Sequence, residues 1–307
     1  MSGMHRNRIK ATGKEKRHNR FRLFFQLAAA ALINGYAVGF TKGRIFTGKS
    51  KIVCVPVLNC YSCPGALGAC PIGSMQAVAG GAKHNVSFYV LGTLMLFGAL
   101  FGRLICGFLC PFGLVQDLLY KIPVKKLRVP KKIDKPLRYL KYLILVLFVI
   151  LLPVVATNRF GIAPPYFCKY ICPVGTLEGG IPHLLMNGEL RKLAGVLFDW
   201  KVGVLVFVIL GSVFISRFFC RYFCPLGAFY SLFNKFSLYQ MNLDKTKCVG
   251  CKKCEKVCPM AIEVTKNLDS PECIRCGKCK AVCQVEAISS GVMIKRDTNN
   301  ELGEEGE

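Results

Sequence analysis

The sequence has few acidic residues and lacks the motifs of most enzymes. It contains 17 Asp and Glu against 42 Lys and Arg, a single Trp, and no Cys-x2-Cys-His motif, P-loop or Rossmann glycine fingerprint. These absences argue against c-type haem and against the common nucleotide-binding folds. No paired carboxylates or nucleophile–base set stands out either. We therefore do not expect a stand-alone catalyst of bond-making reactions.

The chain is instead rich in apolar residues and cysteine. Of its 307 residues 52% are hydrophobic, and 18 are Cys. The apolar content excludes a disordered chain, and the length excludes a small secreted disulfide scaffold. Four apolar stretches approach the roughly 20 residues that a helix needs to cross a bilayer. They cover residues 21–40, 86–105, 139–157 and 202–219. The first exceeds the apolar core of a cleavable signal, so we expect an uncleaved anchor.

Basic residues indicate how these spans are oriented. The densest basic run extends from Lys121 to Arg138, between spans two and three, and another precedes Phe21. The positive-inside rule then places the middle loop and both termini in the cytoplasm, in a multi-pass protein of the cytoplasmic (inner) membrane. The formal net charge of +25 is explained by this topology. We therefore expect membrane lipid, and no nucleic acid, as a partner.

The segment after residue 240 carries the most specific motif. Two runs of the form Cys-x2-Cys-x2-Cys-x3-Cys follow one another, as in bacterial ferredoxins with two [4Fe-4S] clusters, where the last cysteine of each run crosses to the other cluster. The predicted ligands are Cys248, Cys251, Cys254 and Cys283 for cluster one, and Cys258, Cys273, Cys276 and Cys279 for cluster two. Zinc also binds Cys-x2-Cys pairs, but tandem runs of this spacing favour iron–sulfur clusters. Gln284 replaces the usual proline after the second run, which leaves the local turn open.

Two further cysteine pairs end the second and fourth apolar stretches. Both segments read Arg-x2-Cys-x3-Cys-Pro-x-Gly, beginning at Arg103 and at Arg217. Because residues i and i+4 share one helix face, we expect each pair to point together. Facing pairs would form an inner-face cluster site from Cys106, Cys110, Cys220 and Cys224. The two arginines either stabilise an anionic cluster there or simply anchor the span ends by snorkelling.

The remaining cysteines lie in the two outer loops. The loops share a Cys-Pro-x-Gly segment, at Cys70 and at Cys172, so the membrane part looks duplicated. Besides Cys54, they hold the candidate ligands of an outer-face site, Cys60, Cys63, Cys70, Cys168 and Cys172. These thiols either bind a cluster or pair as disulfides, because this side of the membrane can be oxidising.

These motifs together resemble the NapH/NosR-type polyferredoxin-like membrane proteins. The resemblance covers about residues 21–288 and rests on the twin Cys-x3-Cys-Pro segments and the tandem ferredoxin runs. The chain has no room for a large flavin-binding domain, so the short NapH-like form is the better match. The resemblance implies electron transfer between a quinol pool or cytoplasmic donor and a partner oxidoreductase or electron-carrier protein.

The predicted fold is an α-helical integral membrane protein, internally duplicated, with a C-terminal α+β ferredoxin domain. Its parts are a basic tail over 1–20, a membrane domain over 21–240, the two-cluster ferredoxin domain over 241–292 and an acidic tail over 293–307. We expect two [4Fe-4S] clusters, with one or two more at the membrane faces. Clusters at opposite faces would be separated by most of a core about 30 Å thick. We therefore expect a quinone, or a cofactor of a partner, to bridge them.

One alternative function belongs to a different class. The outer cysteines would serve a metal-handling or assembly factor that reduces or transfers a metal such as copper. Thioether ligands suit copper, but the outer loops contain only Met75 and Met186. Electron transfer is therefore the leading interpretation.

Overall fold

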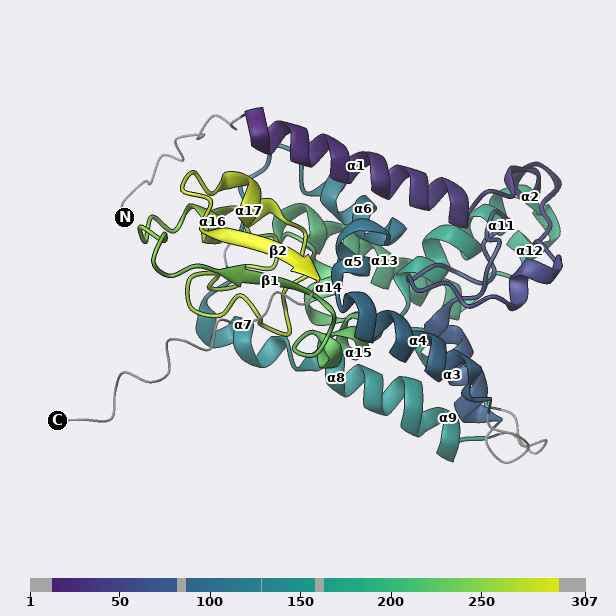
Figure 1. Ribbon diagram of the computed structural model, residues 1–307. Helices are drawn as coiled ribbons and strands as arrows, with labels where there is room; N and C mark the ends of the chain where they lie inside the picture. Colours follow the sequence, from purple (N-terminus) through teal and green to yellow (C-terminus); the bar gives the residue numbers. More distant parts are fainter. Residues whose placement is uncertain (1–12, 82–86, 128, 158–162, 293–307) are drawn as a thin grey trace.

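The computed structural model describes residues 13–81, 87–127, 129–157 and 163–292, which form a helical body with a small mixed domain at one end (Figure 1). The predicted acidic tail and residues 1–12 lie outside the described residues. The elements of the body are α1 (Gly13–Ile33), α2 (Ala37–Lys42), η1 (Lys49–Ile52), α3 (Pro71–Gly80), α4 (Phe88–Phe101), α5 (Leu104–Phe108), α6 (Pro111–Leu119), α7 (Lys131–Leu137), α8 (Leu140–Ile144), η2 (Leu145–Leu151), α9 (Leu152–Val155), α10 (Tyr166–Tyr170), η3 (Gly175–Gly180), α11 (Ile181–Met186), α12 (Gly188–Lys192), α13 (Val196–Phe214), α14 (Phe218–Tyr222) and α15 (Pro225–Phe233). The end domain contains β1 (Tyr239–Leu243), α16 (Lys253–Val257), α17 (Lys278–Val282) and β2 (Ile288–Val292).

Two helices of the described residues are long and apolar enough to cross a membrane, against the four predicted. They are the continuous run Lys131–Val155, which joins α7 to α9, and α13. Both expose large apolar side chains, including Val146, Ile150 and Phe207. A surface of this kind is unusual in water and suited to lipid.

The first and second predicted spans are interrupted in the structure. The stretch 21–40 is not one helix, because α1 ends at Ile33, shortly before Gly35, and α2 begins at Ala37. The stretch 86–105 breaks after α4, where Gly102 has a φ of 54°. An added Cβ at Gly102 would lie 2.7 Å from the side-chain oxygen of Asn234, so this turn requires glycine.

The end domain has a two-stranded sheet and two short helices. β1 and β2 pair antiparallel, with Tyr239 opposite Val292 and Leu243 opposite Ile288. Met241, in the middle of β1, is buried against the domain core. The helices α16 and α17 pack against each other, and α17 also contacts α1 of the body. This arrangement agrees with the predicted α+β ferredoxin domain.

A network of buried ion pairs joins this domain to the body. The carboxylate of Glu272 accepts hydrogen bonds from Arg103 Nη1 at 3.1 Å and from Lys141 Nζ at 2.5 Å. Burial alone would raise the pKa of Glu272, but these two cations hold it below its usual value. Because removing one partner would leave a buried charge, the network fixes how the domain sits on the body.

A second network lies inside the body. Asp117 of α6 pairs with Arg22 of α1 and, at 2.6 Å, with Arg217 beside α14. Burial would raise the pKa of Asp117, but Arg217 and Arg22 hold it well below its usual range. The carboxylate is therefore ionised at neutral pH, and the pairing is lost only in strong acid.

The contact between α5 and the end domain is unusually close. An added Cβ at Gly107 would lie 2.5 Å from the carbonyl oxygen of Ile274. Gly107 also contacts α1, because Arg22 Nε donates a hydrogen bond to its carbonyl oxygen at 2.9 Å. Only glycine permits this approach, which brings the body's cysteines next to those of the domain.

Candidate metal centres

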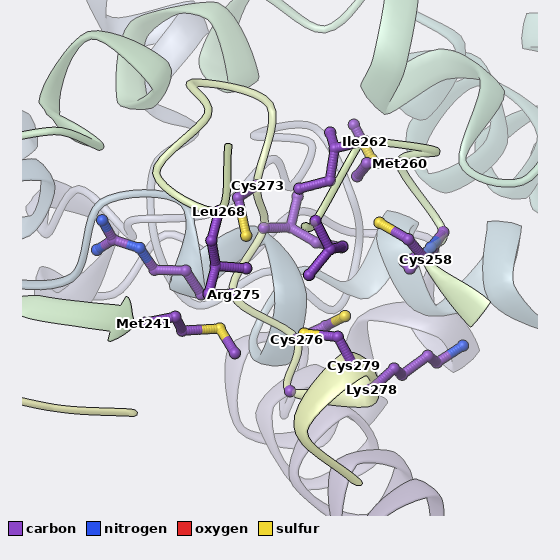
Figure 2. A pocket seen from close by; sticks show the side chains of 14 residues that line it. Met241, Cys258, Met260, Ile262, Leu268, Cys273, Arg275, Cys276, Lys278 and Cys279 are labelled. Atoms are coloured by element: carbon purple, nitrogen blue, oxygen red, sulfur yellow. The ribbon is translucent and has the colours of Figure 1, made fainter. Parts of the chain in front are cut away.

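The cysteines predicted for cluster two surround one cavity of the end domain. Fourteen residues line this cavity, and Figure 2 shows their side chains. Its four cysteines are Cys258, Cys273, Cys276 and Cys279. Apolar side chains such as Met241, Ile262 and Leu268 complete the wall. The set combines the second run with the last cysteine of the first run, as the spacing predicts.

The other predicted set surrounds a second cavity. The residues that line this cavity include Cys248, Cys251, Cys254 and Cys283. This cavity lies nearer the surface, because Cys251 is exposed whereas Cys273, Cys276 and Cys279 are buried. The end domain therefore has one deep set of thiols against the body and one shallow set facing outward.

The backbone around both cavities repeats an unusual conformation. Positive φ angles occur at matched positions of the two runs: Gly250 and Arg275, Lys252 and Gly277, Ala261 and Glu286. Non-glycine residues rarely adopt such angles. Alternating right- and left-handed residues turn successive N–H groups toward one point and form concavities that bind anions, including iron–sulfur clusters. The repetition at Glu286 also settles the turn after Cys283, which keeps its form although proline is absent.

The four inner cysteines converge on one buried site in the body. All four are buried: Cys106, Cys110, Cys220 and Cys224. Burial raises the pKa of the Cys224 thiol, and the nearby Cys220, Cys106 and Cys110 raise it further. Thiols that influence each other in this way lie close together, although the two pairs are more than 100 residues apart in the sequence.

A change of helix follows directly after each pair. Cys106 lies in α5, and Cys110 precedes Pro111 at the start of α6, in an extended conformation. Cys220 and Cys224 are divided in the same way between α14 and α15. The residues up to Leu109 and Phe223 stay right-handed, so the extended cysteine redirects only the chain that follows it.

Arg103 and Arg217 each reach across to the opposite repeat. Arg217 Nη1 donates to the carbonyl oxygen of Cys106 at 2.5 Å, and Arg103 Nη2 donates to that of Cys220 at 3.4 Å. Both residues are completely buried, so they do not snorkel to an interface. Glycines make room for them, because an added Cβ at Gly113 would lie 2.7 Å from Arg217 Nη1. The pair places fixed positive charge beside the inner thiols.

Four outer cysteines line a cavity at the opposite end of the body. The cavity measures about 570 Å³ and contains Cys60, Cys70, Cys168 and Cys172 in its wall. Of the other two outer cysteines, Cys63 lies beside Cys60 and Lys51, and Cys54 lies near Cys70, but neither lines the cavity. All eighteen cysteines of the chain carry free thiols in this structure.

The outer loops contain a repeat that the sequence analysis missed. Cys168-x3-Cys172-Pro173 has the same spacing as the two inner motifs, and each Cys-Pro-x-Gly segment carries a conspicuous side chain six residues after its cysteine. These residues are Gln76, Gln116, Glu178 and Tyr230. Gln116 donates to the sulfur of Cys220 at 3.1 Å, and Gln76 donates to that of Cys168 at 3.3 Å. Aligning all four segments by their prolines would have found this pattern.

Tyr230 connects the inner and outer regions. Its hydroxyl donates to the carbonyl oxygen of Pro56, in the first outer loop, at 2.9 Å. Burial raises the pKa of Tyr230, and so do Cys106 on one side and Cys54 on the other. One continuous buried core contains cysteines of the end domain, the inner site and the outer loops. The inner and outer regions therefore belong to one packed body.

The arrangement of the thiols can be compared with what a zinc site requires. Among the residues that the structure describes, no three His, Cys, Asp or Glu side chains are close enough to share one metal ion. A structural zinc site needs four ligands at about 2.0–2.3 Å from a single ion. A four-iron cluster holds its thiolates farther apart, around a larger core.

Comparisons with known proteins agree with this geometry. The 4Fe-4S binding domain model matches residues 84–130, 142–184 and 197–244, and the 4Fe-4S dicluster domain model matches residues 240–284. An uncharacterized protein of Methanocaldococcus jannaschii is 34% identical over 54% of this chain and 54% of its own length. The putative electron transport protein YccM of Escherichia coli is 28% identical, over 60% and 48%. The regulatory protein NosR of Stutzerimonas stutzeri is 30% identical, over 52% and 20%.

The chain thus belongs to the ferredoxin-like 4Fe-4S binding proteins. Within that class it is related to the NosR-type proteins, which confirms the resemblance predicted from its motifs. The chain spans about half of the length of the first of these relatives, and less of NosR. No solved structure matches it.

Proposed function

We propose that the protein is a membrane-bound electron conduit that carries electrons from one end of the body to the other. The observation that carries this proposal is the continuous buried core, which holds cysteines of the end domain, the inner site and the outer loops in one packed unit. A protein that only stored clusters would not need its thiol sites in a row.

The cysteines predicted from sequence would supply the ligands of three of these sites. In the end domain the shallow set would hold cluster one and the deep set cluster two, and the inner four thiols would hold a third. [4Fe-4S] clusters supply one-electron oxidation and reduction. The chain's own residues fix the positions of the thiols, exclude water and balance charge. Arg103 and Arg217 offset the negative charge that four thiolates bring into the buried site.

Exchange with a soluble partner is best supported at the shallow set. Cys251 is exposed there, and Lys245, Lys247 and Lys252 are exposed around it. This basic surface would attract an acidic electron carrier or oxidoreductase subunit. A quinol remains a second source of electrons, and a quinone or a cofactor of a partner would bridge the distance between the inner and outer thiols.

The proposal includes the full predicted topology. Four spans, with both termini in the cytoplasm, would place the end domain at the cytoplasmic face and the outer loops at the other face. The apolar exposed surfaces of α13 and of Lys131–Val155 support insertion in lipid. The shorter apolar helix α4 would supply the second span.

Metal content and spectroscopy test the function. The anaerobically purified full chain should contain at least about twelve irons and equal acid-labile sulfide, and it should show interacting cubane signals by low-temperature EPR after reduction. In liposomes, an impermeant reductant supplied on one side should reduce an acceptor enclosed on the other. A colourless, zinc-loaded preparation would contradict the proposal, as would a full iron content without any transfer across the bilayer.

A further inference from the structure

The outer cavity repeats the hydrogen bonds of the inner site. Gly175 N–H donates to Cys172 Sγ at 3.4 Å, and Gly227 N–H donates to Cys224 Sγ at 3.3 Å. These two pairs occupy the same position in their repeats. The repetition shows that the outer thiols are held in the manner of the inner ones.

The glutamines extend this correspondence. Gln76 accepts the backbone N–H of Phe167 at 2.8 Å while its side-chain nitrogen donates to Cys168 Sγ. Gln116 accepts the N–H of Phe219 at 3.0 Å while its nitrogen donates to Cys220 Sγ. Both glutamines are buried. A buried amide fixed at its oxygen and aimed at a sulfur is a means of orienting that sulfur and of stabilising negative charge on it.

Three outer thiols follow from the repeat, but the fourth does not. The position that corresponds to Cys106 in the first outer loop is Ala66, which has no thiol. Cys60 takes that place from elsewhere in the loop. An added Cβ on Gly175 would lie 3.9 Å from Cys60 Sγ and 4.0 Å from Cys172 Sγ, so both sulfurs adjoin one glycine.

The position of Cys60 is fixed by its own contacts. The backbone N–H of Cys60 donates to the carboxylate of Glu178 at 2.9 Å. Gly179 leaves room for the sulfur, since an added Cβ there would lie 3.2 Å from Cys60 Sγ. Cys63 is instead buried beside Lys51, outside the cavity. Of the two thiols, Cys60 is the one presented to the other three.

A cation also adjoins the outer thiols. The ammonium group of Lys201, on α13, lies 4.0 Å from the same added Cβ on Gly175. It stands where it can offset the net negative charge of a cluster held by four thiolates. At the inner site the buried Arg103 and Arg217 have this position. The outer site therefore has four thiols, donors to two of the sulfurs, and a balancing cation.

We propose that the outer cavity is a further [4Fe-4S] site whose ligands are Cys60, Cys70, Cys168 and Cys172, with Cys63 and Cys54 left unligated. The proposal rests on the proposed function only in that both need an iron–sulfur protein. The site gives the conduit a terminus at the end opposite the ferredoxin domain. One electron passing along the body would oxidise the inner cluster by one unit and reduce the outer one by one unit, with no bond made or broken.

Two matched alanine variants of the full chain test the ligand set. Cys60→Ala should lose about four irons and four sulfides per chain, from about sixteen of each. Cys63→Ala removes a buried thiol only three residues away, and this variant should retain all of the iron and sulfide. EPR of the reduced samples should show the ferredoxin signals unchanged in both variants, which excludes general misfolding as the cause. Cys168→Ala should reproduce the loss seen for Cys60→Ala.

Other outcomes would overturn the inference in distinct ways. Loss of iron in Cys63→Ala and not in Cys60→Ala would show that the fourth ligand is misassigned. About twelve irons in the unaltered chain, with mass spectrometry of alkylated protein showing Cys60 disulfide-bonded to Cys63, would show that the outer thiols form disulfides. In that case the three other clusters, and with them the proposed function, would stand. Fewer than about eight irons in the unaltered chain would contradict the proposed function itself.

Discussion

The end domain and the body gather their thiols in two different ways. In the end domain each cavity takes three cysteines from one short run and one from the other, and backbone turns such as those at Lys252 and Gly277 shape the site. In the body each site joins two segments that are about 100 residues apart, and side chains such as Arg217 and Gln116 complete it. Local sites depend on the loop, whereas distant ones depend on how helices pack.

We expect the largest effect on electron transfer from removing one inner thiol, which tests the difference between the body and the end domain most directly. Cys220→Ala should lose about four irons per chain and abolish transfer across liposomes, because the inner site lies between the two ends. Cys251→Ala, in the exposed set of the end domain, should also lose about four irons. It should, however, leave the inner signals and their reduction by a small-molecule reductant intact. EPR and iron content measure both, and transfer that persists in Cys220→Ala would show that the inner site is not on the path.

Loss of a buried charge should weaken the body rather than the clusters. Asp117→Ala leaves Arg22 and Arg217 without their carboxylate, and this should cost about 3–5 kcal/mol of stability. The exposed pair Lys192–Glu189 provides the control, since Glu189→Ala should change stability by less than about 1 kcal/mol. Thermal unfolding in detergent, followed by far-ultraviolet circular dichroism of the helices, measures the difference. Equal midpoints for the two variants would contradict this view of the network.

A methyl group added at the interface between the body and the end domain should destabilise the interface by steric overlap. Gly107→Ala brings a Cβ to 2.5 Å from the backbone of Ile274, so the end domain must shift, at a cost of about 1–3 kcal/mol. Gly92→Ala is the matched control, because no atom lies within 4 Å of the added Cβ and alanine favours the helix. Limited proteolysis between body and domain should become faster only in Gly107→Ala. Faster cleavage in both would point to a general loosening instead.

We expect the smallest effect, a shift of reduction potential, from removing the glutamine hydrogen bonds. This change tests whether the inner and outer sites of the body are alike. Gln116→Leu removes a donor to Cys220 Sγ, and Gln76→Leu removes one to Cys168 Sγ. Each loss should lower the reduction potential of the site concerned by on the order of tens of millivolts, because the donor stabilises the more negative state. Redox titration followed by EPR measures the shifts. A shift of the inner signals by Gln76→Leu would contradict the separation of the sites.

Short cysteine spacings predicted the family relationship, which is confirmed. The cysteines of each crossed ligand set line one cavity of the end domain, and their binding of clusters stays a prediction. The described residues contain two helices that are both long and apolar enough to cross a membrane, against the four predicted. The helix α4 ends at Gly102, and α1, although 21 residues long, begins in a polar segment.

The outer site shows why such prediction stops. Ala66 stands where a fourth cysteine would complete the repeat, so no spacing distinguishes Cys60 from Cys63. The packing of η3 decides between them, because Gly175 and Gly179 admit the sulfur of Cys60. The burial of Arg103 and Arg217 is a similar case, since a sequence alone does not tell whether a basic residue at a span end points to water or to a partner.

By itself, the sequence determined the class of chemistry, because thiolate spacing and proline position are local properties that few folds other than a ferredoxin can use. It also determined the apolar character of the body. The twin motifs also predicted the inner set of thiols. Only the tertiary structure decided which outer thiols line one cavity, which cations face the thiols and how the end domain is fastened, because those depend on helices from separate repeats packing within a few ångströms. Contacts of that kind depend on the fold of the whole chain, and no spacing of residues in the sequence predicts them.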